Sequence, residues 1–366
     1  MITSNEKRKP CSVCGIPFFR VTVLSFVGLC VGVMLSSSTL QLSIIFDSSI
    51  EIKRNVTEGN PKLSTNPYVD VKQEDKLSNN TNSTSSRRQS NCISCFQHNF
   101  NYVIQNDIIC KLYSPNQTVE LIVLIMTIHK NTNERMALRA TWLSYTKNNT
   151  ANVRYAFLLG EIDDNKQQEA VLKENSVYHD IIKEDFIDKY VNLTYKTIMG
   201  FKWASTKCAH AHYVMKTDDD MFVNIPNVLN TCKGNHRKTL QKAILGACHA
   251  KASPIRDRKS KWFASVASYP EKSYPGFCSG TGYVTSMHVA SEVYKISSSV
   301  PFFHLEDVYV SLCIRKLGLK LQPIAGFNAG RPKMDPCLYK GDKLITAHQL
   351  TPVMLKSIWH GKCVKQ

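Results

Sequence analysis

Acidic side chains are the scarcer charge in this chain of 366 residues, which has 29 aspartates and glutamates against 46 lysines and arginines. A formal net charge of +17 would suit nucleic acid, but the basic residues are scattered rather than gathered in runs. The balance favours anionic membrane surfaces, nucleotide-sugar phosphates or acidic glycans, and we expect no nucleic-acid partner. The sequence also lacks an internal repeat, so its foldable part is expected to form one large domain.

A long apolar stretch near the N-terminus predicts a membrane anchor. It covers residues 21–46, is strongest up to Leu35, and exceeds the roughly 20 residues that a helix needs to cross a bilayer. Basic residues are frequent in the tail, residues 1–20, and few follow the stretch, which places the N-terminus in the cytosol and the bulk of the chain in the lumen. A cleaved signal peptide that ends after Ser38 is the alternative.

Residues 47–91 have almost nothing to bury and predict a flexible luminal stalk before a domain at residues 92–366. Ten of the 13 cysteines fall between Cys92 and Cys363, and an even number is what an oxidising compartment favours, although the sequence does not give their pairing. Asn-x-Ser/Thr sequons after the anchor also support exposure to the secretory lumen. These sequons begin at Asn55, Asn79, Asn82, Asn116, Asn148 and Asn192.

The domain alternates between strand-like and helix-like segments. Val119–Met126 is a nearly unbroken apolar run, as expected of a strand that is covered on both faces. The alternation predicts an α/β fold with a mostly parallel sheet and helices on both of its faces. The further expected strands are residues 153–159, 180–184 and 213–215, and the expected helices are residues 133–143, 166–174 and 193–208.

Three consecutive carboxylates, Asp218, Asp219 and Asp220, follow the last of these strands. They would repel one another unless a cation lay among them, and oxygen ligands without adjacent cysteine or histidine suit Mg²⁺ or Mn²⁺. Strand side chains alternate, so Asp218 and Asp220 should share a face that Asp219 does not. Because ligands of parallel sheets bind at the carboxyl ends of strands, the sequence predicts a metal–diphosphate site. A solvated acidic turn is the alternative.

Other residue types suit a diphosphate and sugar rings. Arg135 and Arg139 are four apart, so on a helix they share a face and could grip a diphosphate, with a solvated basic face as the alternative. Trp262, Tyr269 and Tyr274 offer aromatic faces for sugar rings, although aromatic residues are more often part of a core.

Two further segments complete the set of candidates. Gly276, Gly280 and Gly282 predict a tight loop that approaches a ligand closely, with a purely structural turn as the alternative. Glu306 and Asp307 open a helix-like run up to residue 317, where acidic residues often only complement the helix dipole. That dipole would lower the carboxylate pKa, whereas burial and a second carboxylate would raise it towards that of a working base.

Five motifs together resemble one family. The chain resembles the β1,3-glycosyltransferases that use UDP-sugars, most closely the β1,3-galactosyltransferases, over about Cys92 to Cys363. The motifs are Arg135-x-x-x-Arg139-x-Thr141-Trp142, Lys216-Thr-Asp-Asp-Asp-Met-Phe-Val-Asn224, Lys261-Trp262, Tyr274-Pro-Gly-Phe-Cys-Ser-Gly-Thr-Gly-Tyr-Val-Thr-Ser286 and Leu305-Glu-Asp-Val-Tyr-Val310. The resemblance implies a GT-A type, Rossmann-like nucleotide-sugar-binding domain, an inverting transfer and a single-pass type II protein of the Golgi membrane.

The resemblance also implies a role for each candidate. Asp307 would be the catalytic base with Glu306 in support, and Asp220, Asp218 and a late histidine, His348, would hold Mn²⁺. An ordinary buried hydrogen-bonding role is the alternative for His348. The donor-binding residues would be Arg135, Arg139, Lys216, Asp218 and Asp219, and the acceptor-binding residues would be Trp262, Tyr274 and Gly280.

Two residues depart from the pattern of the galactosyltransferases. Asp219 is acidic where they often have a non-acidic residue, as in the N-acetylglucosaminyl branch, and Ser311 replaces a glycine and would crowd the site. The expected activity is transfer of galactose from UDP-galactose in β1,3 linkage to a glycan that ends in N-acetylglucosamine. The alternatives are the same chemistry with UDP-N-acetylglucosamine, and a catalytically silent, membrane-tethered glycan-binding protein.

Overall fold

The structure is a computed structural model that describes residues 92–364. The expected tail (residues 1–20), anchor (21–46) and stalk (47–91) lie outside the described residues. Within residues 92–364, no helix is both long enough and apolar enough to cross a membrane.

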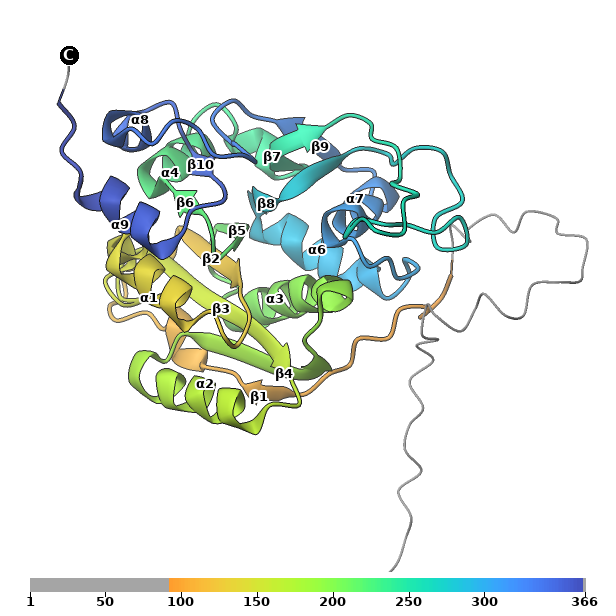
Figure 1. Cartoon of the computed structure of the whole chain (residues 1–366), viewed down its shortest axis with the longest axis horizontal. Helices are drawn as coiled ribbons and strands as arrows, with labels where there is room; N and C mark the ends of the chain where they lie inside the picture. Colours follow the sequence, from red (N-terminus) through yellow and green to blue (C-terminus); the bar gives the residue numbers. More distant parts are fainter. Residues whose placement is uncertain (1–91, 365–366) are drawn as a thin grey trace, which may run out of the picture. The chain divides into compact units, whose positions relative to one another are not determined.

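An eight-stranded sheet with the order β1-β4-β3-β2-β5-β8-β7-β9 forms the centre of the fold (Figure 1). Strands β4, β3, β2 and β5 are mutually parallel, whereas β8 runs antiparallel to both β5 and β7. The expected α/β class with a mostly parallel central sheet is confirmed. The strands are β1 (Tyr102–Ile104), β2 (Leu121–Met126), β3 (Val153–Glu161), β4 (Ile181–Ile187), β5 (Tyr213–Asp218), β7 (Ala243–His249), β8 (Phe277–Ser286) and β9 (Lys320–Pro323).

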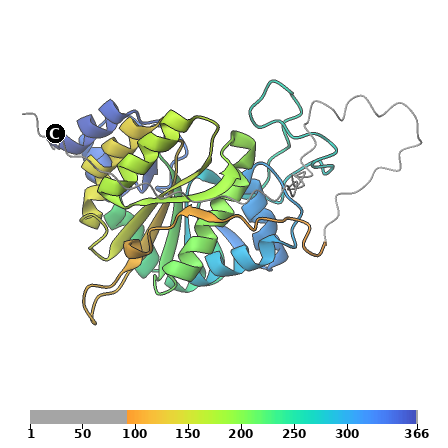
Figure 2. The same ribbon diagram turned by 90° about the horizontal axis from the view of Figure 1, so that it is seen from below.

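Helices lie on both sides of this sheet, as the turned view shows (Figure 2). A separate two-stranded sheet pairs β6 (Phe222–Val223) with β10 (Thr346–Ala347) and so brings the C-terminal segment beside the three aspartates. The helices are α1 (Thr132–Ala140), α2 (Asn165–Tyr178), α3 (Leu193–Lys207), α4 (Ile225–Lys233), α5 (Arg237–Leu240), α6 (Met287–Ser297), α7 (Glu306–Lys316), α8 (Pro336–Lys340) and α9 (Pro352–His360). Single 3-10 turns are η2 (Asp107–Cys110), η3 (Trp142–Thr146) and η4 (Tyr190–Asn192).

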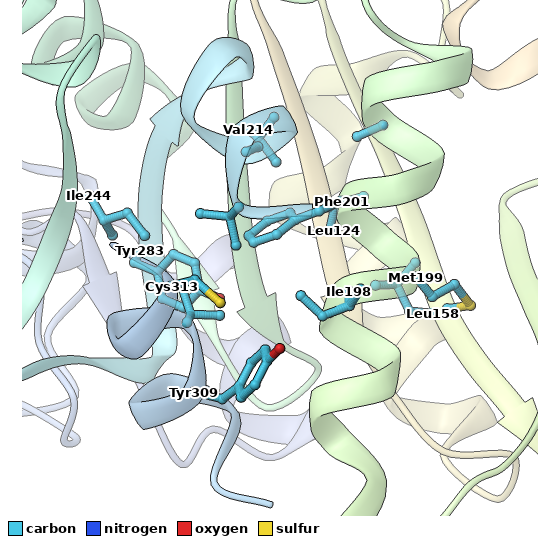
Figure 3. Packing of buried hydrophobic residues seen from close by; sticks show 14 of the residues in the cluster. Leu124, Leu158, Ile198, Met199, Phe201, Val214, Ile244, Tyr283, Tyr309 and Cys313 are labelled. Carbon is cyan, nitrogen blue, oxygen red and sulfur yellow. The ribbon is translucent and has the colours of Figure 1, made fainter. Parts of the chain in front are cut away.

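The all-apolar strand β2 divides its side chains between two cores. Leu124 packs with residues of α3, α6 and α7, while Val123 packs with residues of α1, α4 and α9. Because strand side chains alternate in direction, one strand can serve both faces. In the first core, Ile198 and Phe201 extend from α3 towards the side where α7 carries Tyr309 and Cys313 (Figure 3).

The element boundaries refine the expected ones. The predicted helix at residues 133–143 stops at Ala140, and η3 follows it. The strand predicted to end at Met215 continues to Asp218, so the first aspartate is part of the strand. The predicted glycine loop is wrong for Gly280 and Gly282, which lie inside β8, whereas Gly276 precedes β8 with a φ of +96°.

Four disulfides join eight of the cysteines that the structure describes, and Cys232 and Cys313 are buried and belong to none of these bonds. The bonded pairs are Cys92–Cys95, Cys110–Cys208, Cys248–Cys278 and Cys337–Cys363. The bond between Cys248 and Cys278 ties β7 to β8 two residues before Gly280.

Candidate active site

A cavity of about 360 Å³ opens where β5 ends and α7 begins. It brings together residues from segments far apart in sequence, among them the start of α3, the middle of β8 and the loop after β10. Of the predicted site residues, those that line it are Lys216, Asp218, Trp262, Gly280, Glu306, Asp307 and His348. The fold therefore assembles most of the separate sequence motifs around one cavity.

The three consecutive aspartates have different surroundings. Asp218 lines the cavity with its carboxylate 2.8 Å from Nζ of Lys216, and burial raises the pKa of Asp218. Asp219 is buried and accepts hydrogen bonds from Thr127 (2.6 Å) and Asn131 (2.9 Å). Burial raises the pKa of Asp219 to about 6, although these two hydrogen bonds oppose the shift. Asp219 thus holds the segment after β2 and does not line the cavity.

Asp220 lies next to His348. Its Oδ2 is 3.1 Å from Nε2 of the imidazole, whose Nδ1 lies 3.0 Å from the carbonyl of Ala329. The hydrogen bond with Asp220 raises the pKa of His348, so the two groups form an ion pair when the imidazole is protonated. The backbone supports this contact, because the N–H of Leu350 donates to the carbonyl of Asp220 at 2.9 Å.

The donor atoms at this edge suit a divalent cation only in part. Asp220 contributes a carboxylate that is 41% exposed, and His348 contributes an imidazole nitrogen. No group of three or more histidine, cysteine, aspartate or glutamate side chains among residues 92–364 is arranged to hold a metal ion. Mn²⁺ accepts both donor types and commonly completes its shell with water and phosphate oxygens, so these two residues fit a partial ligand set.

A buried ammonium group connects the aspartates to α7. Lys216 is 3% exposed, lies 2.9 Å from Oε1 of Glu306, and donates a hydrogen bond to the carbonyl of Gly280. Burial alone would lower the pKa of Lys216, but the charges of Asp218 and Glu306 outweigh it and raise the pKa above its usual value. Oε2 of Glu306 accepts from Thr197 at 3.1 Å and from Tyr283 at 3.4 Å.

Asp307 is the carboxylate best prepared to accept a proton. Its Oδ1 accepts from the N–H of Val308 at 2.8 Å and its Oδ2 accepts from the N–H of Gly280 at 3.3 Å. Burial, together with the charge of Glu306, raises the pKa of Asp307 to about 7. A carboxylate in a cavity with a pKa near neutrality matches the requirement for a general base.

The structure does not bring Arg135 and Arg139 to the cavity. Arg135 is fully buried and makes a two-pronged ion pair with Glu174, and Arg139 pairs with Asp180 and Glu174. The expected grip on a diphosphate is therefore replaced by contacts between α1, α2 and the start of β4. Arg135 also donates to Thr127 at 3.3 Å, the residue that binds Asp219, so it supports the site indirectly.

Only one of the three predicted aromatic contacts lies at the cavity. Trp262 is 49% exposed and lies beside Lys261, whose Nζ is 4.7 Å from the centre of the indole ring. Tyr269 and Tyr274 are buried and pack edge to face at 4.8 Å, so the expected acceptor contact of Tyr274 is not brought to the cavity. They belong to the core, the alternative that their residue type favoured.

Ser311 does not crowd the cavity. Its buried hydroxyl donates to the carbonyl of Asp307 at 2.9 Å, one turn back along α7, and it lines a different hollow beside Arg315. The expectation of crowding is wrong, because residues four apart on a helix lie one above the other and Ser311 lies a turn below the cavity.

Several residues at the site had little or no signal in the sequence. Thr197 of α3 and Tyr283 of β8 support Glu306, and only the fold brings them to it. His304 lines the cavity and its ring nitrogen lies 2.9 Å from the carbonyl of Phe263, while burial lowers its pKa. Its place two residues before Glu306 was the one available hint.

Comparison with known proteins agrees with the motifs. The sequence pattern of the family described as galactosyltransferase matches residues 133–325. The chain is 41% identical to Beta-1,3-galactosyltransferase 1 of Homo sapiens over 271 residues, which are 74% of this chain and 80% of that protein. It is 38% identical to Beta-1,3-galactosyltransferase 5 of Homo sapiens over 244 residues, 66% of this chain and 77% of that protein. The chain therefore belongs to the galactosyltransferase family.

Proposed function

We propose that this protein is an inverting β1,3-galactosyltransferase that moves galactose from UDP-galactose to a glycan ending in N-acetylglucosamine. The family supports transfer of galactose, and relatives that cover most of the chain are named β1,3-galactosyltransferases. The single observation that carries the proposal is Asp307, a carboxylate with a pKa of about 7 in the same cavity as the strand-end carboxylate Asp218.

In the proposed reaction, Asp307 accepts the proton of the acceptor hydroxyl as its oxygen bonds to the anomeric carbon of galactose. The bond between that carbon and the UDP oxygen breaks on the opposite face, so the configuration inverts and UDP leaves. General-base help of this kind contributes about 10² to 10⁴ in rate. Trp262, half-exposed at the cavity wall, offers an apolar face on which a sugar ring can stack.

We further propose that Mn²⁺ is required, held by Asp220 and His348 with Asp218 nearby. When bound, the ion would neutralise the charge that develops on the departing UDP. The ion pair between Asp220 and His348 keeps these donor atoms together at the cavity edge.

The localisation belongs to the same proposal: a single-pass type II protein of the Golgi membrane with a luminal catalytic domain. It is supported by the apolar residues 21–46 and by the four disulfides, which form in oxidising compartments.

The experiment is a donor and acceptor panel with the full-length protein purified in detergent. UDP-galactose, UDP-N-acetylglucosamine and UDP-glucose are each offered with β-N-acetylglucosaminides and β-galactosides, and the product linkage is determined by NMR. Release of UDP with a new β1,3-linked galactose is expected. Preferential transfer from UDP-N-acetylglucosamine would establish the alternative donor, and glycan binding without any transfer would establish the silent binding protein.

A further inference from the structure

One buried side chain, Lys216, contacts three elements of the cavity at once. Its Nζ lies 2.8 Å from Asp218 at the end of β5 and 2.9 Å from Glu306 at the start of α7, and it donates to the carbonyl of Gly280 in β8. Two of these contacts are hydrogen bonds, to Asp218 and to the carbonyl of Gly280, and the contact with Glu306 is an ion pair. Because two protein carboxylates already pair with this buried ammonium group, its contacts lie within the protein, in place of the contact with the diphosphate of a nucleotide sugar that the family resemblance implied.

Gly280 connects Lys216 to Asp307 through its two backbone groups. Its carbonyl accepts from Lys216 and its N–H donates to Oδ2 of Asp307 at 3.3 Å. A Cβ atom at this position would overlap the carboxylate of Glu306 and lie 3.3 Å from Nζ of Lys216. Only glycine allows the strand to approach both charged groups so closely. The direction of the Asp307 carboxylate therefore depends on where Lys216 holds β8.

We propose that Lys216 is a positioning residue, which holds Gly280 and Glu306 and so aims the Asp307 carboxylate at the acceptor hydroxyl. The inference rests on the proposed function, because it assigns Asp307 the role of base. It also links the two ends of the site, since the same ammonium group pairs with Asp218 on the donor side.

The charges around Asp307 allow two effects of Lys216 to be measured separately: its effect on the position of the Asp307 carboxylate and its effect on the pKa of that carboxylate. Glu306 raises the pKa of Asp307, whereas Lys216 lowers it. Removal of Lys216 should therefore move the acid limb of the pH–rate profile to higher pH, and neutralisation of Glu306 should move it to lower pH. Other ionisable groups that interact electrostatically with Asp307 are Tyr190 before α3, Tyr274 before β8 and Tyr283 within β8. Asp218, Lys261, His304 and His348 line the same cavity.

The test is a double-mutant cycle of Lys216→Met and Glu306→Gln, with kcat and both KM values measured against pH. Lys216→Met should lower the plateau of kcat by about 10²-fold, the loss expected from a reacting group displaced by about 1 Å. The donor KM should stay close to that of the wild type. In the double variant both charges are gone, so the acid limb should return towards its wild-type position. The plateau of kcat should stay low, because no ammonium group binds the carbonyl of Gly280.

Lys183→Met is the matched control, because Lys183 is also 3% exposed and pairs with Glu161 and Gln168 away from the cavity. It should reduce stability without moving the acid limb. If Lys216→Met does not fold, the plateau of kcat can still be measured in the double variant, which leaves no buried, unpaired charge at Glu306. A raised donor KM with a normal plateau, or full recovery of the plateau in the double variant, would overturn the inference. A wild type that transfers no sugar would instead contradict the proposed function.

Discussion

At the scale of the residue, access to the cavity separates carboxylates that hold the structure from one that can react. Asp219 and Glu174 are both buried and accept hydrogen bonds from fixed donors. Asp307 faces the cavity, its carboxylate accepts hydrogen bonds from two backbone N–H groups, and its pKa is raised to about 7. A group in this state can take up a proton near neutral pH.

Replacement of Asp307 with asparagine should lower kcat by about 10² to 10⁴, because the shape is kept while the proton acceptor is lost. In the wild type, kcat/KM should rise with pH through about 7, where Asp307 ionises. Initial rates of UDP release between pH 5 and pH 9, with each buffer held at the same ionic strength, check both points. Near-normal transfer by Asp307→Asn would place the base elsewhere.

The same substitution should stabilise the folded protein at neutral and alkaline pH. The pKa of Asp307 is raised from an ordinary value of about 4 to about 7, so its contribution to stability is full below pH 4 and is lost as the pH rises through 7. Asparagine does not ionise and avoids this loss. Thermal unfolding of both proteins at pH 4 and pH 8 should show a higher Tm for the variant at pH 8 alone.

Asp220→Asn should act differently from Asp307→Asn. If Asp220 holds the metal, the variant should bind the UDP-sugar more weakly, whereas Asp307→Asn should bind it normally. EDTA should stop the wild-type reaction and added Mn²⁺ should restore it. Titration of donor binding by calorimetry, with and without Mn²⁺, separates the two variants, and full activity in a chelated preparation would remove the metal from the proposal.

At the scale of the element, the segment that carries His348 depends on a turn at Gly326. The carbonyl of Gly326 accepts from the N–H groups of Ile345 (2.7 Å) and Thr346 (3.1 Å). Its φ is +96°, and a Cβ there would overlap the carbonyl of Lys343. Since β10 pairs with β6, this turn sets where His348 meets Asp220.

Gly326→Ala should therefore destabilise the protein by more than the roughly 1–2 kcal/mol that a left-handed alanine costs. Gly318→Ala is the matched control, because its φ is +68° and nothing lies within 4 Å of the added Cβ. Denaturant unfolding of both variants gives the comparison. Equal losses would show that the overlap at Gly326 is relieved without cost.

At the scale of the whole molecule, the disulfide Cys110–Cys208 joins η2 to the residue after α3 across 98 positions of sequence. Cys337–Cys363 spans only 26 positions and ties α8 to the end of the chain. A longer closed loop restricts the unfolded chain more, so the first bond should contribute more to stability.

Replacement of both Cys110 and Cys208 with alanine should lower the free energy of unfolding by about 4–5 kcal/mol, against about 3–4 kcal/mol for the pair Cys337 and Cys363. Non-reducing denaturant titrations measure both, and mass mapping confirms that the remaining disulfides are unchanged. A larger loss for the shorter loop would show that native contacts, rather than loop closure, dominate.

The sequence by itself determined the α/β class, because apolar runs of strand length alternate with helical segments, and it determined the family, because five motifs occur in order. It also predicted Asp218, Glu306, Asp307 and His348 as site residues, and the fold brings these four to one cavity. These predictions rest on local sequence patterns, which do not depend on the tertiary contacts that the chain makes.

Only the tertiary structure decided which charged groups are free. The sequence predicted that Arg135 and Arg139 bind a diphosphate. In the fold, they form ion pairs with Glu174 and Asp180, which lie about 40 residues later in the chain. Lys216 likewise became a link between three elements only when β8 and α7 came together. A side chain's partners come from residues distant in sequence, so the same arginine or lysine serves binding or structure according to the packing around it.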